Sequence, residues 1–271
     1  MNYNKNNPLK VATVCSGYDS MCLAFDRLKE TYPDFDYDLV LWSEFDPEST
    51  QPLEKQPAVI AHNALFPQWA NRNLGDMTKI DWSSQPDFDL LFYSTPCQSI
   101  SQAGLQHGFT EGSGTRSSII WHIRDAVKAK KPKYLILENV RAMVSQKFIG
   151  VFNLWRNELD KLGYASFAQI LDSKNYGIPQ HRERIFLVSI RIDDEEPRFH
   201  FPVGFPLELC LLDMLEDNVD EKFFLNDDML ARFCERSLEV EENNEIDNDD
   251  EFDFNLQEDA ECLRGGGNLY N

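Results

Sequence analysis

One cysteine of this sequence stands where a nucleophile would be useful. The segment Ser94-Thr-Pro-Cys-Gln-Ser99 follows directly on the apolar run Leu90–Tyr93, which has the composition of a buried strand. Loops at the carboxyl ends of parallel strands hold the ligands of open α/β sheets. Pro96 restricts the backbone before Cys97 and so helps to fix the direction of its sulfur. A single cysteine is more often a small buried apolar residue than a nucleophile. A catalytic role for Cys97 therefore depends on other reactive groups at neighbouring strand ends.

A carboxyl group and two guanidinium groups follow at later strand ends. Glu138 comes directly after the apolar run Tyr134–Leu137. Arg182 and Arg184 alternate just before the run Ile185–Ile190, and at a spacing of two they lie on the same side of an extended segment. Each group also has a structural interpretation, as a helix cap or as the partner of a surface acid. A nucleophilic cysteine, an acid and paired guanidinium groups, in order along one sheet edge, indicate an active site.

The first part of the sequence has three features that suit a nucleoside cofactor. Ser16, Gly17 and Tyr18 form a small-residue turn after the first apolar run, where backbone N–H groups approach a ligand at a helix N-terminus. Glu44 ends the second run, where an acid accepts hydrogen bonds from ribose hydroxyls. Asp76, in a later turn, is placed to face an adenine amino group. Each feature alone is explained by a turn glycine or a capping acid, but their order at strand ends predicts a nucleoside site.

These residues need a sheet whose strand ends meet at one edge. The apolar runs predict strands over Leu9–Cys15, Leu39–Trp42, Leu90–Tyr93, Tyr134–Leu137, Ser166–Leu171 and Ile185–Ile190. Apolar residues at helical spacing predict helices over Ser20–Glu30, Pro47–Asn63, Thr115–Lys131 and Gln146–Leu162, and a short helix over Leu207–Leu215. Strands that alternate with helices predict an α/β fold, a doubly wound and mostly parallel sheet covered on both faces.

The net charge of −20 is concentrated in the last part of the chain. Residues 1–191 hold 21 Lys and Arg and 21 Asp and Glu, whereas residues 192–271 hold 5 against 25. Because phosphates require Lys and Arg, this composition argues against nucleic-acid binding for the last part only. The absence of a signal peptide and of an apolar run near ~18 residues predicts a cytoplasmic protein without a membrane partner. The six cysteines form no CxxC pair, so we expect neither disulfides nor a metal site.

The motifs together resemble the C5-cytosine-specific DNA methyltransferase family over roughly residues 9–202. The motifs are the glycine turn at Cys15–Ser20, Glu44, Asp76, Pro96-Cys97-Gln98, Gly114-Thr-Arg116-Ser117, Glu138-Asn139-Val140 and Gln180-His-Arg182-Glu-Arg184. The resemblance implies a Rossmann-like domain that binds S-adenosyl-L-methionine and double-stranded DNA, with the target cytosine flipped into the site. It also implies that the Cys97 thiolate attacks C6 of the ring.

The resemblance implies roles for the other site residues as well. Glu138 hydrogen-bonds the ring and delivers a proton, Arg184 binds the O2 carbonyl, and Arg182 supports the pocket. The cofactor contacts are Ser16, Gly17, Tyr18, Glu44, Asp76, Met77 and Pro96. The substrate contacts are Gln98, Ser99, Arg116, Ser117, Asn139 and Val140.

This sequence departs from the family pattern at two places. Cys15 and Asp19 stand where the first motif usually has an aromatic residue and a second glycine, and Asp19 is expected to cap the helix that follows. The motifs that come after the recognition region in the family are not visible. The resemblance therefore implies a catalytic domain over residues 1–202 and, over 203–271, a connector and partial recognition region. Within it, the acidic segment 235–261 is predicted to be mobile.

Three interpretations of this organisation remain open. The chain is a catalytic half that a second polypeptide completes, a truncated enzyme without activity, or an acidic regulatory protein that mimics DNA for a basic partner. Within the enzyme class, RNA is the alternative substrate. The glutamine after Cys97 favours DNA, because RNA-modifying relatives usually replace it.

Overall fold

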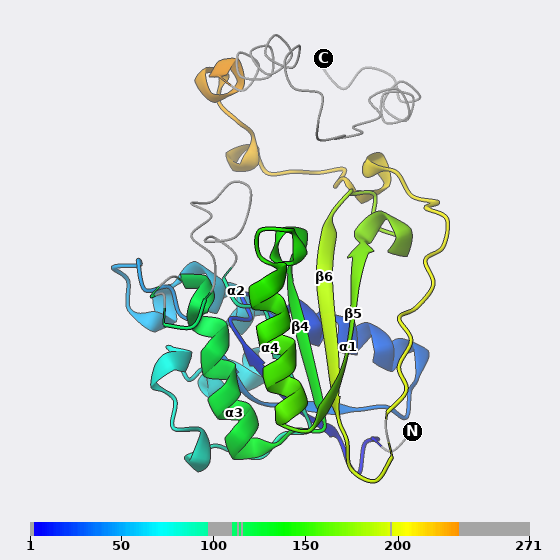
Figure 1. Ribbon diagram of the computed structural model, residues 1–271. Coiled ribbons are helices and arrows are strands. Elements are labelled where there is room, and N and C mark those ends of the chain that lie inside the picture. The colour runs from blue at the N-terminus through cyan, green and yellow to red at the C-terminus, as the bar shows by residue number, and fades with distance from the viewer. Residues whose placement is uncertain (1–2, 97–109, 113, 115, 196, 233–271) are drawn as a thin grey trace. The chain divides into compact units, whose positions relative to one another are not determined.

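The structure, a computed structural model, describes residues 3–96, 110–112, 114, 116–195 and 197–232. By their contacts the residues group into two units, 1–173 with 181–204 and 174–180 with 205–271. The first unit contains the sheet and the α-helices labelled in Figure 1. None of the described helices is long and apolar enough to cross a membrane. The functional division of the chain between residues 202 and 203 stays a prediction.

Six strands of the described residues form one mixed sheet, in the order β2-β1-β3-β4-β6-β5. They are β1 Leu9–Val14, β2 Tyr37–Ser43, β3 Leu90–Tyr93, β4 Tyr134–Val140, β5 Tyr164–Asp172 and β6 Glu183–Arg191. Strands β2, β1, β3 and β4 run parallel, which confirms the predicted α/β sheet. Strand β6 is antiparallel to both β4 and β5. This arrangement follows because the connection of residues 173–182 is too short for a crossover helix.

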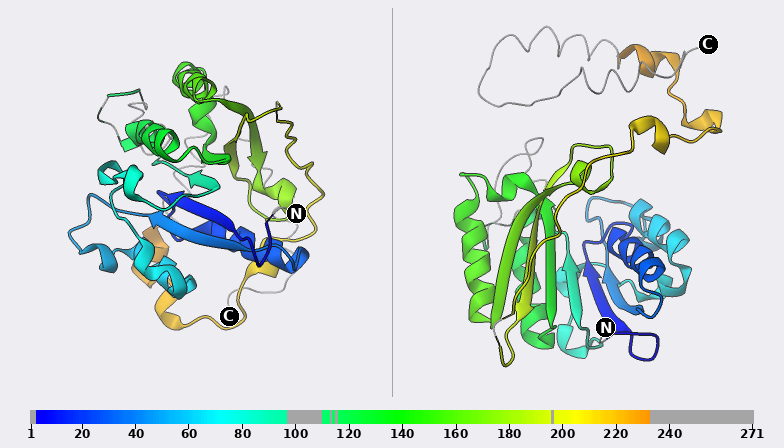
Figure 2. Two further views of the ribbon diagram at one scale, coloured as in Figure 1. Left: turned by 90° about the horizontal axis from the view of Figure 1, so that it is seen from below. Right: turned by 90° about the vertical axis from the view of Figure 1, so that its right-hand side faces the viewer.

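The α-helices cover both faces of the sheet. They are α1 Ser20–Thr31, α2 Pro57–Leu65, α3 Ile123–Lys130 and α4 Ile149–Lys161. Helices α3 and α4 lie on one face, in front in Figure 1, and α1 and α2 lie on the other, as Figure 2 also shows. Strand β1 shows the same division. Ala12 and Val14 belong to the apolar cluster of α3 and α4, whereas Leu9 and Val11 belong to that of α1 and α2, because successive side chains of a strand alternate.

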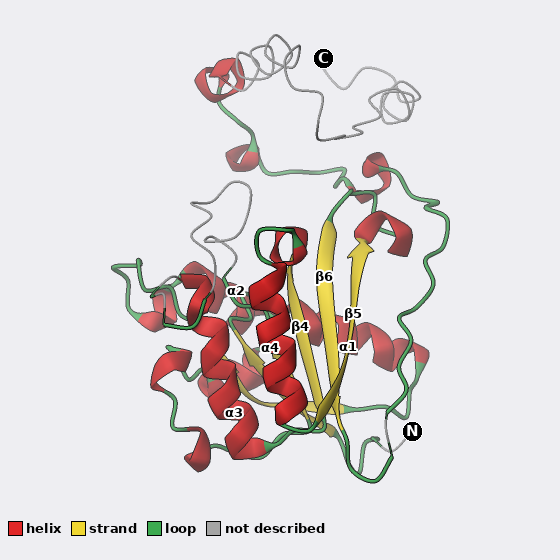
Figure 3. Ribbon diagram, in the orientation of Figure 1, coloured by secondary structure: helices red, strands yellow, loops and turns green. Residues whose placement is uncertain are grey.

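Three α-helices are shorter than the periodicity predicts: α2 and α3 by more than a turn, and α4, predicted over Gln146–Leu162, by a few residues at its ends. The predicted helix Pro47–Asn63 begins only at Pro57, because the residue before a proline is pushed toward extended backbone and Gln56 has φ −70° and ψ 137°. The predicted helix Thr115–Lys131 starts as the 3-10 helix Arg116–His122 (Figure 3). Further 3-10 helices span Leu53–Lys55, Pro67–Arg72, Met77–Lys79, Trp82–Ser84, Arg141–Val144, Ser173–Tyr176, Leu211–Met214 and Glu221–Phe223.

The strand register brings the predicted site residues to one edge of the sheet. Ser43, Val14, Tyr93 and Leu137 lie abreast on β2, β1, β3 and β4. The residues that follow them therefore share one edge, here called the carboxyl edge. Because β6 is antiparallel, it starts at this edge, and Arg184 pairs with Val140 at the end of β4. The carboxyl edge thus collects the ends of β2, β1, β3, β4 and β5 and the start of β6.

In the second unit, Phe205 connects the segment from residue 205 onward to the segment 174–180. Its backbone N–H donates a hydrogen bond to the carbonyl oxygen of Asn175 at 2.9 Å. Where the sequence predicts a helix over Leu207–Leu215, the structure has only the 3-10 helix Leu211–Met214. The apolar side chains of this segment are exposed, so little packing favours a longer helix. The acidic segment 235–261 lies outside the described residues.

Candidate active site

The end of strand β4 carries an acid that is held from two sides. Glu138 Oε2 accepts a hydrogen bond from the hydroxyl of Ser94, just after β3, at 2.6 Å. Its other oxygen, Oε1, lies 3.1 Å from Nε of Arg184, near the start of β6. Both members of this ion pair have 22% of their side-chain surface exposed. A carboxylate fixed by two donors and still open to solvent can meet a ligand in one orientation.

The two predicted arginines have different environments. Arg184, rather than Arg182, pairs with Glu138. Arg182 precedes β6 and is exposed, and its backbone N–H donates to Asp172 Oδ1 at 3.0 Å. The other oxygen of Asp172 lies 2.6 Å from Nδ1 of His181. Asp172, which the sequence analysis missed, therefore fixes the chain just before β6. Its position at the end of a predicted strand was the only available signal.

Asn139 supports the loop that leads to Cys97. Its side chain is buried, and Nδ2 donates to the carbonyl oxygen of Thr95 at 2.9 Å. Its Oδ1 accepts from the N–H of Val140 at 2.9 Å. Val140 itself packs, half-buried, against the apolar cluster of α3 and α4. Asn139 thus holds Thr95 in the loop that leads to Cys97, and the substrate contacts predicted for Asn139 and Val140 stay predictions.

Five predicted residues have no described side chain. Cys97, Gln98 and Ser99 lie outside the described residues. Arg116 and Ser117 begin the 3-10 helix before α3, and only their backbone is described. The roles of these residues stay predictions.

The turn between β1 and α1 has an unusual backbone. Cys15, Gly17 and Asp19 have positive φ angles of 52°, 58° and 67°. The Gly17 N–H donates to Glu44 Oε2 at 2.7 Å, so the acid after β2 fixes this turn. A Cβ added to Gly17 would meet no atom within 4 Å, and Ser16 Oγ is buried without a hydrogen-bond partner among the described residues. The unpartnered Ser16 hydroxyl and the open space at Gly17 each fit a bound ligand at this turn.

Asp19 does not cap α1 as predicted. It is the N-cap residue, but its side chain makes no capping hydrogen bond. Instead, its Oδ2 accepts from the hydroxyl of Thr13 on β1 at 2.6 Å, and the residue is buried. Burial raises the pKa of Asp19 to about 6. The neighbouring Tyr18, a predicted cofactor contact, is 52% exposed.

Glu44 is anchored by Asn73, a residue that the sequence analysis missed. Asn73 Oδ1 accepts from the Glu44 N–H at 3.1 Å, and Asn73 Nδ2 donates to the Glu44 carbonyl at 3.2 Å. A parallel bridge between Trp42 and Asn73 continues the sheet beyond β2. No local pattern marks Asn73, because its partner is 29 residues away in the sequence.

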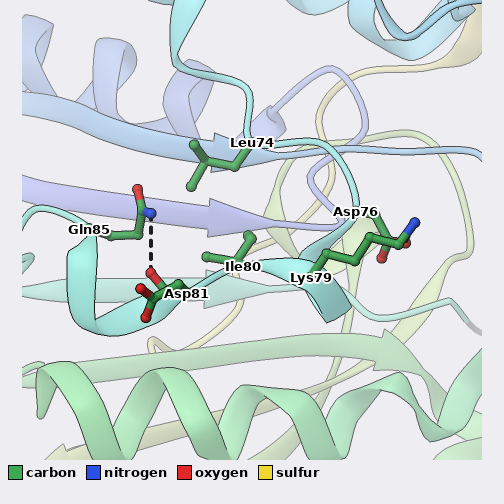
Figure 4. A pocket seen from close by; sticks show the side chains of 6 residues that line it. All are labelled: Leu74, Asp76, Lys79, Ile80, Asp81 and Gln85. Carbon is green, nitrogen blue, oxygen red and sulfur yellow. Dashed lines mark hydrogen bonds and ion pairs between the residues drawn. The ribbon is translucent and has the colours of Figure 1, made fainter.

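Asp76 and Met77 have different surroundings. Met77 is buried, and its sulfur lies 3.7 Å from the sulfur of Cys15 in the turn after β1. Asp76 accepts from the Thr78 N–H at 3.0 Å and pairs with Lys79 at 3.0 Å. A surface pocket of about 260 Å³ is lined by Leu74, Asp76, Lys79, Ile80, Asp81 and Gln85 (Figure 4). Asp76 therefore stands at a hollow of the surface, with Lys79 beside it.

The fold and these contacts define a Rossmann-like α/β domain with a candidate nucleoside site. Its parallel strands end in a glycine turn that is bonded to an acid after the next strand, which is the arrangement of nucleoside-binding sheets. Further along the same edge, an ion-paired carboxylate adjoins the loop that leads to a cysteine.

A family model of the C-5 cytosine-specific DNA methylases matches residues 9–261, and the chain belongs to this family. Members of the family take their methyl group from S-adenosylmethionine. The chain is 44% identical over 161 residues to the type II methyltransferase M2.ScrFI of Lactococcus lactis subsp. cremoris, covering 59% of this chain and 44% of that protein. It is 36% identical over 141 residues to the type II methyltransferase M.HhaI of Haemophilus parahaemolyticus, covering 52% and 42%.

Solved structures share the fold. The Entamoeba histolytica methyltransferase EhMeth matches with a TM-score of 0.56 and 18% identity, over 82% of this chain and 64% of that one. A mutant of Spodoptera frugiperda DNMT2 matches with a TM-score of 0.55 and 19% identity, over 79% and 62%. At these identities the likeness concerns the fold. The chain spans about half the length of the curated relatives that it matches, from 40% to 51%.

Proposed function

We propose that this chain is the catalytic part of a DNA (cytosine-5-)-methyltransferase. It transfers a methyl group from S-adenosylmethionine to C5 of a cytosine flipped out of double-stranded DNA. The observation that carries the proposal is the Glu138 carboxylate, fixed between Ser94 Oγ at 2.6 Å and Arg184 Nε at 3.1 Å on the carboxyl edge. Membership of the family and the names of the relatives support it.

Cys97 is the nucleophile in this proposal. Its thiolate forms a bond to C6 of the ring, and the electron pair of the C5–C6 double bond moves through the ring toward N3. Glu138 hydrogen-bonds N3 and the exocyclic amine and delivers the proton that N3 takes up. Arg184 binds O2 and stabilises the negative charge that develops there. C5 then accepts the methyl group, and removal of the C5 proton by a base expels the Cys97 thiolate.

The cofactor site of this proposal is the turn after β1 with the acids after the next strands. Bound S-adenosylmethionine supplies the electrophilic methyl group. Its contacts are Ser16, Gly17, Tyr18, Glu44, Asp76, Met77 and Pro96. The unpartnered hydroxyl of Ser16 and the open space at Gly17 support this assignment. Glu44 orients the turn through its hydrogen bond to Gly17 and accepts from the ribose hydroxyls.

We also infer that a second polypeptide completes the enzyme in the cytoplasm. Residues 1–202 form the catalytic domain, and residues 203–271 form a connector and part of the recognition region. The charge of residues 192–271 supports this inference, because 5 Lys and Arg against 25 Asp and Glu are a poor match for DNA phosphates.

The test measures covalent trapping and methyl transfer. The chain is incubated with labelled S-adenosylmethionine and duplex DNA, with and without a polypeptide that carries a basic recognition region. We expect label at cytosine C5, and a covalent adduct with 5-fluorocytosine DNA that Cys97→Ser abolishes and the control Cys210→Ser retains. An adduct that persists in Cys97→Ser would remove this cysteine from the mechanism. Label in transfer RNA but not in DNA would favour the RNA alternative.

A further inference from the structure

Asp19 joins the start of α1 to the end of β1. Its carboxylate is buried, at 1% exposure, and accepts from the Thr13 hydroxyl at 2.6 Å. Thr13 is itself fully buried in strand β1. The bond therefore connects the last residue of the turn after β1 to the strand that precedes this turn. The bond thus holds the turn on its buried side.

The backbone of Asp19 explains why such a bond is needed. Its φ of 67° lies in the left-handed region, which costs free energy for any residue with a Cβ, although Asp and Asn tolerate it best. Cys15, at the other end of the turn, has a φ of 52°. A glycine adopts this conformation freely but brings no side chain to hold it. Asp19 instead combines a tolerated left-handed backbone with a buried anchor.

His62 of α2 lies on the other side of the carboxylate. Its Nε2 is 3.7 Å from Asp19 Oδ2, and both side chains are fully buried. The imidazole stacks on Trp42 of β2, with ring centroids 3.6 Å apart. Neither ring nitrogen has a hydrogen-bond partner among the described residues, and neither does Asp19 Oδ1. The carboxylate thus has one hydrogen bond from β1 and a polar neighbour on α2.

Other titratable groups also face this carboxylate. Cys22 of α1 is buried beside it, and Glu44, after β2, adds negative charge near it. Burial raises the pKa of Cys22 and lowers that of His62, so neither thiolate nor imidazolium is favoured there. The Thr13 hydroxyl donates to the carboxylate at 2.6 Å, and Cys22 is a further hydrogen-bond partner of Asp19.

We propose that Asp19 is a positioning residue for the cofactor, because its buried bond to Thr13 holds the turn that presents Ser16 and Gly17. The hydrogen bond from Gly17 to Glu44 fixes the turn from the β2 side, and the Asp19–Thr13 bond fixes it from the β1 side. His62 of α2 lies against the other side of the Asp19 carboxylate. The identity of the ligand, S-adenosylmethionine, rests on the proposed function. The support of the turn by the Asp19–Thr13 bond does not.

The test uses substitutions in the full chain that distinguish the effect of the left-handed backbone at Asp19 from the effect of its side-chain hydrogen bond. Asp19→Asn keeps both an acceptor and a tolerated left-handed backbone. Asp19→Gly keeps only the backbone, and Asp19→Ala keeps neither. Thr13→Val removes the donor at constant shape. The matched control is Asp26→Asn on the same helix, whose carboxylate accepts from the Tyr37 hydroxyl, away from the turn.

Two readouts are taken well below the unfolding temperature. Calorimetry gives the Kd for S-adenosylmethionine, and hydrogen–deuterium exchange follows residues 14–20 without cofactor. For Asp19→Ala, Asp19→Gly and Thr13→Val we expect a Kd at least about tenfold higher and faster exchange of the turn. Asp19→Asn and the control stay near the unsubstituted chain. Rescue by asparagine distinguishes an anchor from a general loss of stability.

The outcomes separate this inference from the proposed function. If the unsubstituted chain binds no S-adenosylmethionine even with the second polypeptide, the proposed function fails, and the exchange data still test the anchor. If Thr13→Val and Asp19→Gly leave both Kd and exchange unchanged, the positioning role of Asp19 is overturned. If Asp19→Ala does not fold, Asp19→Gly and Thr13→Val test the positioning role of Asp19 in its place.

Discussion

Arg184 and Glu138 meet diagonally across two antiparallel strands. Val140 is the register partner of Arg184 and Phe186 that of Glu138, and the ion pair between the two strands is 3.1 Å long. The pair exists because β6 enters the sheet at the edge where β4 ends. If β6 ran parallel to β4, its start would lie at the opposite edge, and the guanidinium would be far from the acid.

The first prediction concerns Glu138→Gln. Glutamine keeps an acceptor for Ser94 but loses the charge that pairs with Arg184 and the proton that it delivers. We expect kcat to fall by roughly 10²- to 10⁴-fold, while the Kd for S-adenosylmethionine stays within about threefold. Single-turnover methyl transfer and calorimetry measure the two values. Glu183→Gln, which only breaks a surface pair with Arg141, is the control. Equal losses in kcat and affinity would assign Glu138 a structural role.

The second prediction compares the two arginines. Arg184→Ala leaves Glu138 without its cationic partner and removes the donor for O2, so we expect kcat to fall by roughly 100-fold. Arg182→Ala removes an exposed side chain and leaves the backbone bond to Asp172 intact. Its effect should be about tenfold or less. Methyl transfer at saturating cofactor measures both. A larger loss for Arg182→Ala would contradict this assignment.

The third prediction concerns the support of the cysteine loop. Asn139→Ala removes the buried donor to Thr95 and leaves its carbonyl without this partner. The free energy of unfolding should fall by about 1–3 kcal/mol, the cost of an unsatisfied buried polar group. Urea denaturation measures it, with the exposed Asn153→Ala on α4 as the control. No loss of stability would mean that water or another side chain replaces this bond.

The fourth prediction concerns pH. Because burial raises the pKa of Asp19 to about 6, the contribution of its protonation to stability is present in acid and is lost as the pH rises through this value. Asparagine does not ionise. Relative to the unsubstituted chain, Asp19→Asn should therefore gain about 1.4 kcal/mol between pH 5 and pH 8, the equivalent of one pKa unit. Chemical denaturation at each pH measures this difference.

The same experiment needs one further comparison. His62 lies 3.7 Å from Asp19 and has a lowered pKa, so its titration opposes that of the carboxyl group. The histidine is present in both proteins, and its contribution largely cancels in the difference. Repeating the measurement in a His62→Phe background, which keeps an aromatic ring on Trp42, should preserve the sign. A pH-independent difference would show that Asp19 titrates normally.

The sequence by itself determined which residues stand at strand ends. Apolar runs marked each strand of the sheet, and Glu44 and Glu138 follow such runs directly, so their places on the carboxyl edge were predictable. This success has a simple reason. A buried strand must be apolar over its length, and a polar residue at its end is visible in the local pattern.

Only the tertiary structure decided the direction of β6 and the partners of the site residues. Periodicity reports which side chains share a face but not the direction of a strand, so it left the meeting of Arg184 with Glu138 undetermined. The roles of Asn73, Asp172 and Asn139 come from hydrogen bonds between segments that are distant or buried. Asp19 is a residue type typical of helix caps, but its side chain accepts from the buried Thr13 hydroxyl instead. Local propensity could not show this, because the competing partner is brought there only by the packing of helix on sheet.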